Sequence, residues 1–232
     1  MKTIGLLGGM SWESTLLYYQ QINELVKAKL GGLHSAQIAM VSVDFQEIEE
    51  LQHAGQWDAT GDILGKAASQ VERAGADFLL ICTNTMHKVA PQIEAEIEIP
   101  LLHIADATAE RIKAAEIQNI GLLGTRFTME QDFYAGRLRD AHGLNVILPP
   151  KADRDLVHRV IYEELVLGVV RDESRREYLR IMDELRAAGA EGVIEGCTEI
   201  VMLVQQGHTE IPLFDTTSIH AEAAVERAVD SE

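Results

Sequence analysis

The chain has 232 residues, 47% of them hydrophobic, which fits a soluble globular protein of one large or two small domains. Its 37 acidic residues outnumber the 20 basic ones, and the resulting charge of −17 is spread along the chain. This charge excludes nucleic acid and anionic membrane surfaces as partners, because both select clustered Lys and Arg. Two cysteines are too few for a disulfide framework, and we expect no signal peptide, no membrane span and a cytoplasmic location.

The sequence carries no cofactor or metal motif. Its eight histidines lack the paired spacing of a zinc site, and neither G-x-G-x-x-G nor a Walker A pattern is present. Lys88 has no phosphate-binding motif nearby that would favour pyridoxal phosphate. We therefore expect neither a metal nor a cofactor.

Apolar runs alternate with segments of helical periodicity, which predicts strands separated by helices. The predicted strands are the apolar runs 2–8, 41–45, 78–82, 99–103, 120–124, 144–149, 192–195 and 211–214. The predicted helices span about 12–30, 57–73, 105–115, 153–168, 172–188 and 218–228, with two more beginning near 85 and 128. Ser11 is the expected N-cap of the first helix, Thr128 opens a capping box, and 44–55 is predicted as a polar loop.

Three segments recur in the same order in the second half of the chain. The paired segments begin at Ile4 and Ile120, at Ala74 and Ala188, and at Ile99 and Ile211, with offsets of 116, 114 and 112 residues. This pattern indicates an internal duplication of an α/β unit. Alternating strands and helices predict parallel sheets covered on both faces, with ligands outside the carboxyl ends of the strands. We expect the site in a cleft between the two halves.

A polar cluster follows a predicted strand in each half. The first runs over 81–87 and the second over 195–200. Aligning the halves sets Thr83 opposite Cys197 and Cys82 opposite Gly196. Because neighbouring residues of a strand point to opposite faces, only one of Cys82 and Thr83 can face the site. The alignment selects Thr83 and leaves Cys82 as a core residue.

Cys197 is the candidate acid-base group. It lies in a glycine-flanked turn before a predicted helix, where unpaired N–H groups would favour a thiolate and lower the pKa. The alternative is a small buried apolar residue, a common fate of free cysteine. Asn84 and Thr85, after the other strand, could hold a carboxylate, and their alternative role is to cap a helix.

With these residues in view, the chain resembles the aspartate/glutamate racemase family of cofactor-independent amino-acid racemases. The resemblance extends over nearly the whole length and is carried by these motifs: Ile4-Gly5-Leu6-Leu7-Gly8-Gly9-Met10, Asn84-Thr85-Met86-His87, Gly121-Leu122-Leu123-Gly124-Thr125 and Gly196-Cys197-Thr198-Glu199. It implies two pseudo-symmetric α/β domains with the active site between them, a small amino-acid substrate and a homodimer. The implied domains are 1–103 with 209–232, and 104–208.

The resemblance also implies roles for individual residues. In the family, two cysteines flank the substrate α-carbon, one thiolate removing the α-proton while the opposite thiol supplies another. Cys197 matches the second cysteine, which works on the L-face. The residues that match carboxylate binders are Asn84, Thr85 and Thr198, and Met10 is expected to line the cleft. Thr83 occupies the position of the first cysteine.

This chain departs from the family pattern in two ways. A threonine hydroxyl is a far weaker acid than a thiol, so Thr83 could relay a proton or position water but is a poor isolated base. Cys82 could replace it only through a backbone twist. Basic residues that face the substrate side chain in aspartate-specific relatives are also missing from 44–48 and 163–168. Gln52 and Glu164 are the candidates for polar contacts there, Glu164 to the substrate ammonium, although both types are more often solvent-exposed.

The sequence therefore predicts an amino-acid racemase that acts on aspartate, glutamate or other polar amino acids, with α-proton transfer between Cys197 and the Thr83 side. A single-cysteine decarboxylase or cis-trans isomerase of the same fold is one alternative. A binding protein without catalysis is another, because two lobes around a cleft also suit ligand sensing.

Overall fold

The strands lie in two separate parallel sheets. The computed structural model describes residues 1–229 and divides into unit 1, Met1–Ile104 with the chain from Thr217 on, and unit 2, Ala105–Thr216. Unit 1 contains β1 (Ile4–Gly8), β2 (Ile38–Ser42) and β3 (Phe78–Ile81) in the order β2-β1-β3. Unit 2 contains β4 (Asn119–Gly124), β5 (Asn145–Ile147), β6 (Gly192–Gly196) and β7 (Leu213–Asp215) in the order β5-β4-β6-β7.

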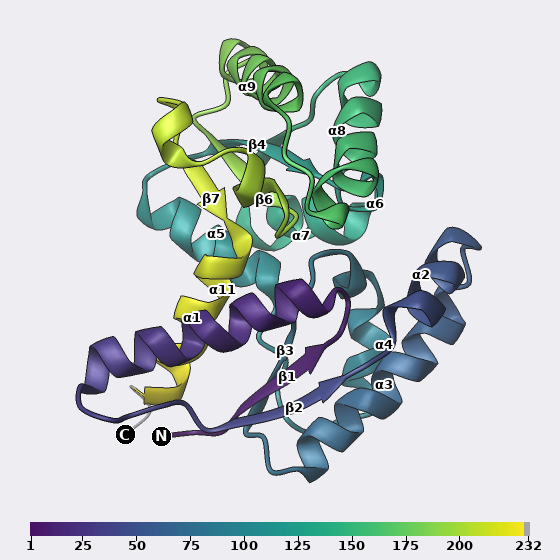
Figure 1. Ribbon diagram of the computed structural model, residues 1–232, viewed down its shortest axis with the longest axis vertical. Coiled ribbons are helices and arrows are strands. Elements are labelled where there is room, and N and C mark those ends of the chain that lie inside the picture. Colours follow the sequence, from purple (N-terminus) through teal and green to yellow (C-terminus); the bar gives the residue numbers. More distant parts are fainter. Residues whose placement is uncertain (230–232) are drawn as a thin grey trace. The chain divides into compact units, whose positions relative to one another are not determined.

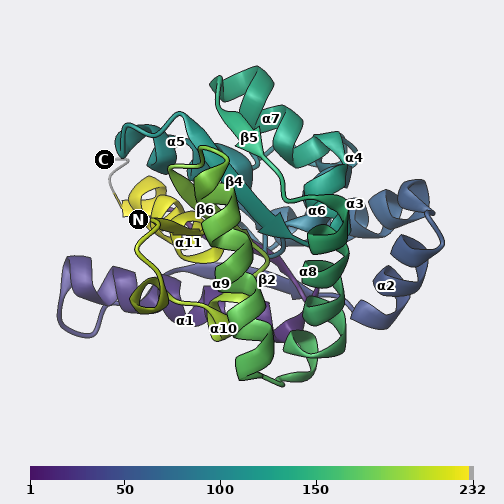
Figure 2. The same cartoon turned by 90° about the horizontal axis from the view of Figure 1, so that it is seen from above.

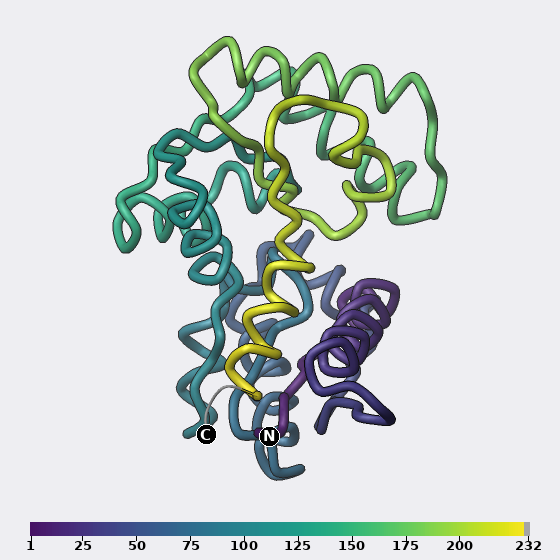
Figure 3. Tube along the Cα trace, turned by 90° about the vertical axis from the view of Figure 1, so that its left-hand side faces the viewer, coloured from purple at the N-terminus to yellow at the C-terminus, as the bar shows by residue number. Residues whose placement is uncertain are grey.

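Helices cover both faces of the first sheet. Helix α1 (Trp12–Leu30) and α11 (Thr216–Val229) contribute to one core cluster with β1 and β3, and Figure 3 shows α11 beside α1. On the other face lie α2 (Phe45–His53), α3 (Trp57–Arg73) and α4 (Ala90–Glu94), as Figure 1 shows. The 3-10 helix η1 (Thr85–Val89) links β3 to α4. Both faces of β1 and β3 are apolar, as expected of strands buried on two sides.

The second sheet is enclosed in the same manner. Its helices are α5 (Ile104–Ala114), α6 (Arg126–Glu130), α7 (Asp132–His142), α8 (Lys151–Glu163), α9 (Asp172–Ala187) and α10 (Ile200–Leu203). Short 3-10 turns, η2 (Leu165–Leu167) and η3 (Gln206–His208), complete it. Helices α8 and α9 lie side by side in Figure 2.

The strand registers confirm the duplicated α/β fold. Ile4 pairs with Phe78 in unit 1, and Ile120 pairs with Gly192 in unit 2. A single bridge between Leu79 and Leu101 matches the pairing of Val193 with Leu213. Each sequence repeat therefore makes the same strand pairings in its own sheet.

The last helix of each half packs with the other unit. Helix α5 follows the Leu101 bridge of unit 1 but belongs to unit 2, and α11 follows β7 of unit 2 but belongs to unit 1. The family resemblance implies that all of 209–232 belongs with the first half, and of these residues 230–232 lie outside the part of the chain that the structure describes. The structure places α11 with the first half, whereas β7 pairs with β6 because strand pairing within the repeat is preserved.

Several local expectations were wrong. Strand β2 spans Ile38–Ser42 rather than 41–45, and the predicted strand 99–103 is reduced to the isolated bridge at Leu101. Residues 45–53 form α2 rather than a loop, with the Asp44 carboxylate accepting the Gln46 N–H at 3.1 Å. The buried residues of the helix are Ile48 and Gln52, and because only Ile48 is apolar, the apolar periodicity that would indicate a helix is weak. The helix after β4 begins earlier than expected, because Thr125 rather than Thr128 is its N-cap and accepts the Thr128 N–H at 3.3 Å.

Candidate active site

The turn after β3 presents Thr83 and encloses Cys82. Cys82 is fully buried among Ile4, Leu6 and Leu80, and burial raises the pKa of its thiol far above the ordinary value. Thr83 is half-buried. This alternation confirms that Cys82 is a core residue and that a thiolate at this position is disfavoured.

Asn84 and Thr85 begin η1 and are almost fully buried, Asn84 being 4% exposed. The Asn84 side chain makes no capping hydrogen bond to η1. The alternative role of Asn84 as a helix cap therefore does not apply. Its amide is placed at the carboxyl end of β3, the edge at which ligands of parallel sheets bind.

The loop after β1 lies beside this turn, because β1 pairs with β3. Gly9 has φ +92°, and a Cβ there would lie 2.2 Å from the Val43 carbonyl oxygen, so the position requires glycine. The Gly9 N–H is held by Thr15 Oγ1 at 2.8 Å. Met10 is buried in the core cluster that also contains Ile48. Gln52 is buried one turn beyond Ile48 on α2 rather than exposed in a loop.

The corresponding turn of unit 2 carries a thiol paired with a carboxylate. Cys197 follows β6 and is half-buried, and its Sγ donates a hydrogen bond to Glu199 Oε2 at 2.9 Å. Burial raises the pKa of Cys197 well above its ordinary value, and the charge and hydrogen bond of Glu199 raise it further. The expectation of a lowered pKa was wrong. The following helix α10 has only four residues and begins after Glu199. The Glu199 carboxylate therefore affects the pKa of Cys197 more than the N-terminus of this short helix does.

Each of the two turns, described by itself, carries polar groups suited to acid-base chemistry or to anion binding. Thr198 is buried next to Cys197, as Asn84 is next to Thr83. The Cys197–Glu199 pair can give up or receive a proton, while hydroxyl and amide groups can bind a carboxylate. Within residues 1–229, no group of three or more His, Cys, Asp and Glu side chains is arranged to hold a metal ion. In the same range, no helix has the length and apolar character needed to cross a bilayer.

The model of the family described as Asp/Glu/Hydantoin racemase matches residues 7–224. The chain belongs to this family. Membership confirms the resemblance expected from the sequence motifs, and it agrees with the two parallel-sheet units described above.

Three relatives within this group are informative. A Yersinia pestis protein provisionally named an Asp/Glu racemase is 56% identical, with a TM-score of 0.94 over 99% of this chain and all of the other. The aspartate racemase homologue PH1733 from Pyrococcus horikoshii is 34% identical, with a TM-score of 0.86 over 98% of this chain and 99% of the other. The broad specificity amino-acid racemase RacX of Bacillus subtilis is 20% identical over 96% of each chain.

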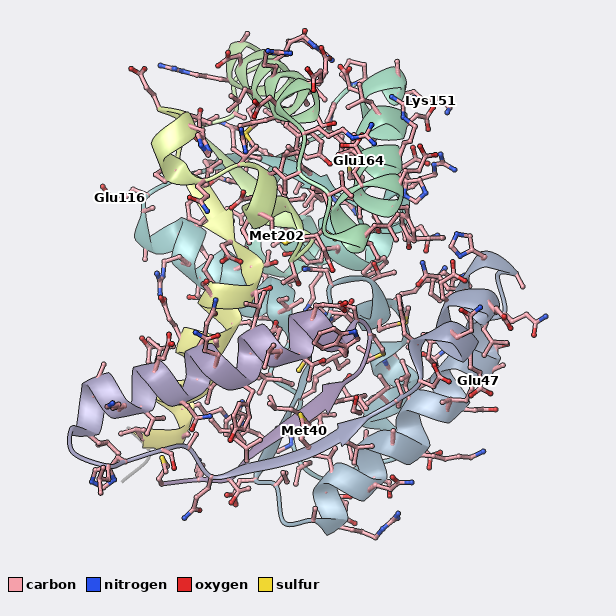
Figure 4. The ribbon with its side chains drawn as sticks, in the orientation of Figure 1. Met40, Glu47, Glu116, Lys151, Glu164 and Met202 are labelled. Carbon is pink, nitrogen blue, oxygen red and sulfur yellow. The ribbon has the colours of Figure 1, made fainter. Side chains whose placement is uncertain are left out.

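Residues 163–168 include no basic residue, but folding brings an arginine to Glu164. Glu164 lies at the end of α8 (Figure 4), where it accepts a hydrogen bond from Ser174 Oγ at 2.6 Å. Arg171 Nη1 lies 3.7 Å from its other oxygen. The expectation of no nearby cation was therefore incomplete, because Arg171 is seven residues away in sequence.

Tyr178, on α9, is a residue whose pKa depends on both Glu164 and Cys197. Its hydroxyl donates to the Val157 carbonyl at 2.9 Å. Burial is the main reason that the pKa of Tyr178 lies well above its ordinary value. The negative charges that Cys197 and Glu164 can carry raise this pKa further. Cys197 and Glu164 thus both lie within electrostatic range of one residue of α9. No sequence motif singles out Tyr178, which the helical periodicity predicts only as part of the helix 172–188.

Glu195 is a second feature absent from the sequence expectations. It lies on β6 two residues before Cys197 and is only 3% exposed. Burial raises its pKa to about 8, and the charge of Asp215, its register partner on β7, acts in the same direction. Its Oε1 has no hydrogen-bond partner among residues 1–229. The aligned residue of the first half is Ile81, so the repeat itself gave no reason to expect a carboxyl here.

Proposed function

We propose that the protein is an amino-acid racemase that works without a cofactor, moving the α-proton between Cys197 and the Thr83 side. Membership in the Asp/Glu/Hydantoin racemase family supports an isomerase of this kind. The observation that carries the proposal is the Cys197–Glu199 hydrogen bond at the carboxyl end of β6.

In the proposed reaction, Glu199 takes the thiol proton, and the resulting Cys197 thiolate takes the α-hydrogen of the L-enantiomer. The electron pair of the broken C–H bond stays on the substrate as a carbanion. A proton delivered to the opposite face gives the D-enantiomer, and the reverse sequence restores the L-enantiomer. A high resting pKa keeps Cys197 protonated, so the thiol holds the proton that this reversal requires.

The substrate α-carboxylate is assigned to Asn84, Thr85 and Thr198. All three are buried at the carboxyl ends of β3 and β6. Amide and hydroxyl donors that are already desolvated and fixed cost little reorganisation when the carbanion forms. In this proposal, Met10 and Gln52 support the binding surface from the β1 loop and from α2, and Met10 acts through packing because its side chain lies in the core.

Thr83 is the weaker of the two proton-transfer groups. Its hydroxyl has to relay a proton from water, because an isolated threonine hydroxyl does not ionise near neutral pH. Conversion to the D-enantiomer is then slower than return of the proton by Cys197. Proton exchange at the L-face should exceed net racemisation.

We assign polar amino acids as the substrate class, with neutral side chains handled at least as well as acidic ones. Arg171 is the cation beside Glu164, and Glu164 already neutralises it. Arg126, at the carboxyl end of β4, pairs with Asp155 at 3.1 Å. A substrate side-chain carboxylate would compete with these acidic residues for either arginine, whereas a hydroxyl or amide would not require an uncompensated cation.

A panel of L- and D-amino acids monitored by chiral chromatography tests this function. Appearance of the opposite enantiomer supports it. Loss of carbon dioxide or a geometric isomer would instead support a single-cysteine decarboxylase or cis-trans isomerase, and tight binding without turnover would support a binding protein. The homodimer and the cytoplasmic location remain predictions, the first to be checked by light scattering and the second by cell fractionation.

A further inference from the structure

His87 follows the turn that carries Thr83, and each of its ring nitrogens takes part in a hydrogen bond. Nδ1 lies 2.8 Å from the Thr83 carbonyl oxygen, and Nε2 lies 3.2 Å from the backbone nitrogen of Ile104. A carbonyl only accepts and an N–H only donates, so Nδ1 carries the proton and Nε2 accepts. The ring is neutral and joins the turn to the start of α5.

The surroundings of His87 hold it in this state. The side chain is 2% exposed, and the centre of its ring lies 4.4 Å from that of His103, with the planes tilted by 59°, and 6.0 Å from that of His220. His220 is fixed in turn, because its Nε2 donates to the Leu102 carbonyl and its Nδ1 accepts from the Tyr18 hydroxyl, both at 2.8 Å. Burial and the neighbouring histidines lower the pKa of His87 well below its ordinary value.

The Thr83 turn is thus held at two successive carbonyls. Ser14 Oγ of α1 donates to the Cys82 carbonyl at 3.0 Å, and His87 donates to the Thr83 carbonyl. In unit 2, the carbonyl of the aligned residue, Cys197, accepts the backbone N–H of Ile200 at 3.0 Å. The half that carries threonine in place of the thiol therefore uses a side chain where the other half uses the backbone.

We propose that His87 is a positioning residue that fixes the Thr83 hydroxyl for proton delivery by holding the Thr83 carbonyl through its Nδ1–H. This inference rests on the proposed racemase function. It assigns a role to His87, the histidine of the Asn-Thr-Met-His segment. In this role His87 acts through the Thr83 backbone and does not contact the reacting atoms. A weak acid such as a threonine hydroxyl depends on placement, because small displacements of a reacting group cost large factors in rate.

Two amide replacements test the two ring nitrogens separately. In His87→Asn the amide nitrogen is bonded to Cγ, as Nδ1 is, so the donor to Thr83 is kept. In His87→Gln the amide lies one atom further out and matches Nε2 instead. Tyr18→Phe is the matched control, since it removes a buried hydrogen bond from the same cluster without touching His87.

The measured quantity is the ratio of D-product formation to α-hydrogen exchange from the L-enantiomer in deuterium oxide. Partial unfolding lowers both rates equally and leaves this ratio unchanged. We expect His87→Gln to lower the ratio about tenfold, His87→Asn to stay within about twofold, and Tyr18→Phe to match the wild type. An unchanged ratio in His87→Gln, or an equal fall in Tyr18→Phe, would overturn the inference.

Amide hydrogen exchange of 83–87, followed by mass spectrometry, keeps the inference testable if the wild type shows no racemase activity. Failure of the proposed function then appears as absent turnover in every protein. Faster amide exchange in His87→Gln than in His87→Asn and Tyr18→Phe would still support positioning of the turn by Nδ1. Equal protection in all three variants would overturn it.

Discussion

The thiol of Cys197 donates a hydrogen bond to Glu199 across 2.9 Å, and these two residues come from one short turn after β6. The carboxylate helps to keep the thiol protonated at rest and, because it accepts the hydrogen bond of the thiol, it is also placed to remove that proton. The acid-base role that we propose for Cys197 therefore depends on a carboxylate two residues away.

Replacing each cysteine in turn tests which thiol works. Cys197→Ser should reduce turnover by about 10²–10⁴-fold, the usual contribution of a general base. Cys82→Ser should retain most of the turnover per folded molecule, because Cys82 is buried in the core and its pKa is raised by burial. Steady-state rates corrected for the folded fraction decide this, and equally severe losses in both variants would contradict our assignment of the Thr83 turn.

Glu199→Gln should separate thiol reactivity from catalysis. Removing the carboxylate charge removes one cause of the high pKa of Cys197, so alkylation by iodoacetamide at a fixed pH should become faster. Turnover should fall by about tenfold or more, because the base that accepts the thiol proton is lost. Alkylation is followed by mass spectrometry at Cys197. Slower alkylation together with unchanged turnover would show that Glu199 has neither role.

Pairing a thiol with a hydroxyl predicts unequal isotope exchange. The two enantiomers have equal free energy in achiral water, so kcat/KM must be equal in both directions. In deuterium oxide, L-substrate should exchange its α-hydrogen faster than D-product appears, whereas recovered D-substrate should carry little deuterium. Thr83→Cys should bring exchange and conversion closer together. Exchange that keeps pace with racemisation from both enantiomers in the wild type would rule out a one-thiol mechanism.

Glu164→Gln should change substrate preference. The substitution leaves a hydrogen-bonding side chain beside Ser174 but removes the charge that neutralises Arg171. We expect kcat/KM for aspartate relative to asparagine to rise about tenfold, since an uncompensated arginine favours a second carboxylate. Arg171→Gln in the same background should cancel the gain. A ratio unaffected by Glu164→Gln would mean that neither residue contacts the substrate side chain.

Glu195→Gln should raise stability at alkaline pH. The folded pKa of about 8 lies above the ordinary 4.5, so between these values the folded state binds more protons than the unfolded state. The free energy of unfolding therefore falls as pH rises through this window. The variant should gain about 2–4 kcal/mol near pH 9 and little near pH 4. Thermal melts across pH measure the gain, with the exposed Glu226→Gln as a control that should follow the wild type.

The sequence by itself determined the repeat, the fold class and the two turns. Apolar runs and helical spacing are local properties, so α1 from Trp12 to Leu30 and α3 from Trp57 to Arg73 were predicted with their observed limits. The alternation of strand side chains likewise separated Cys82 from Thr83. The motifs around Asn84 and Cys197 identified the family, because residue types at a fixed spacing can be recognised without any knowledge of packing.

Only the tertiary structure decided the pKa values of the buried groups and the units to which α5 and α11 belong. Burial is set by elements distant in sequence, so the raised pKa values of Cys197 and Glu195 could not be read from a turn or a strand alone. The same applies to Arg171 beside Glu164, and to α11, which follows a strand of one unit yet packs in the core of the other. His87 acquires its two backbone partners in this way, because Thr83 and Ile104 come together only when the chain folds.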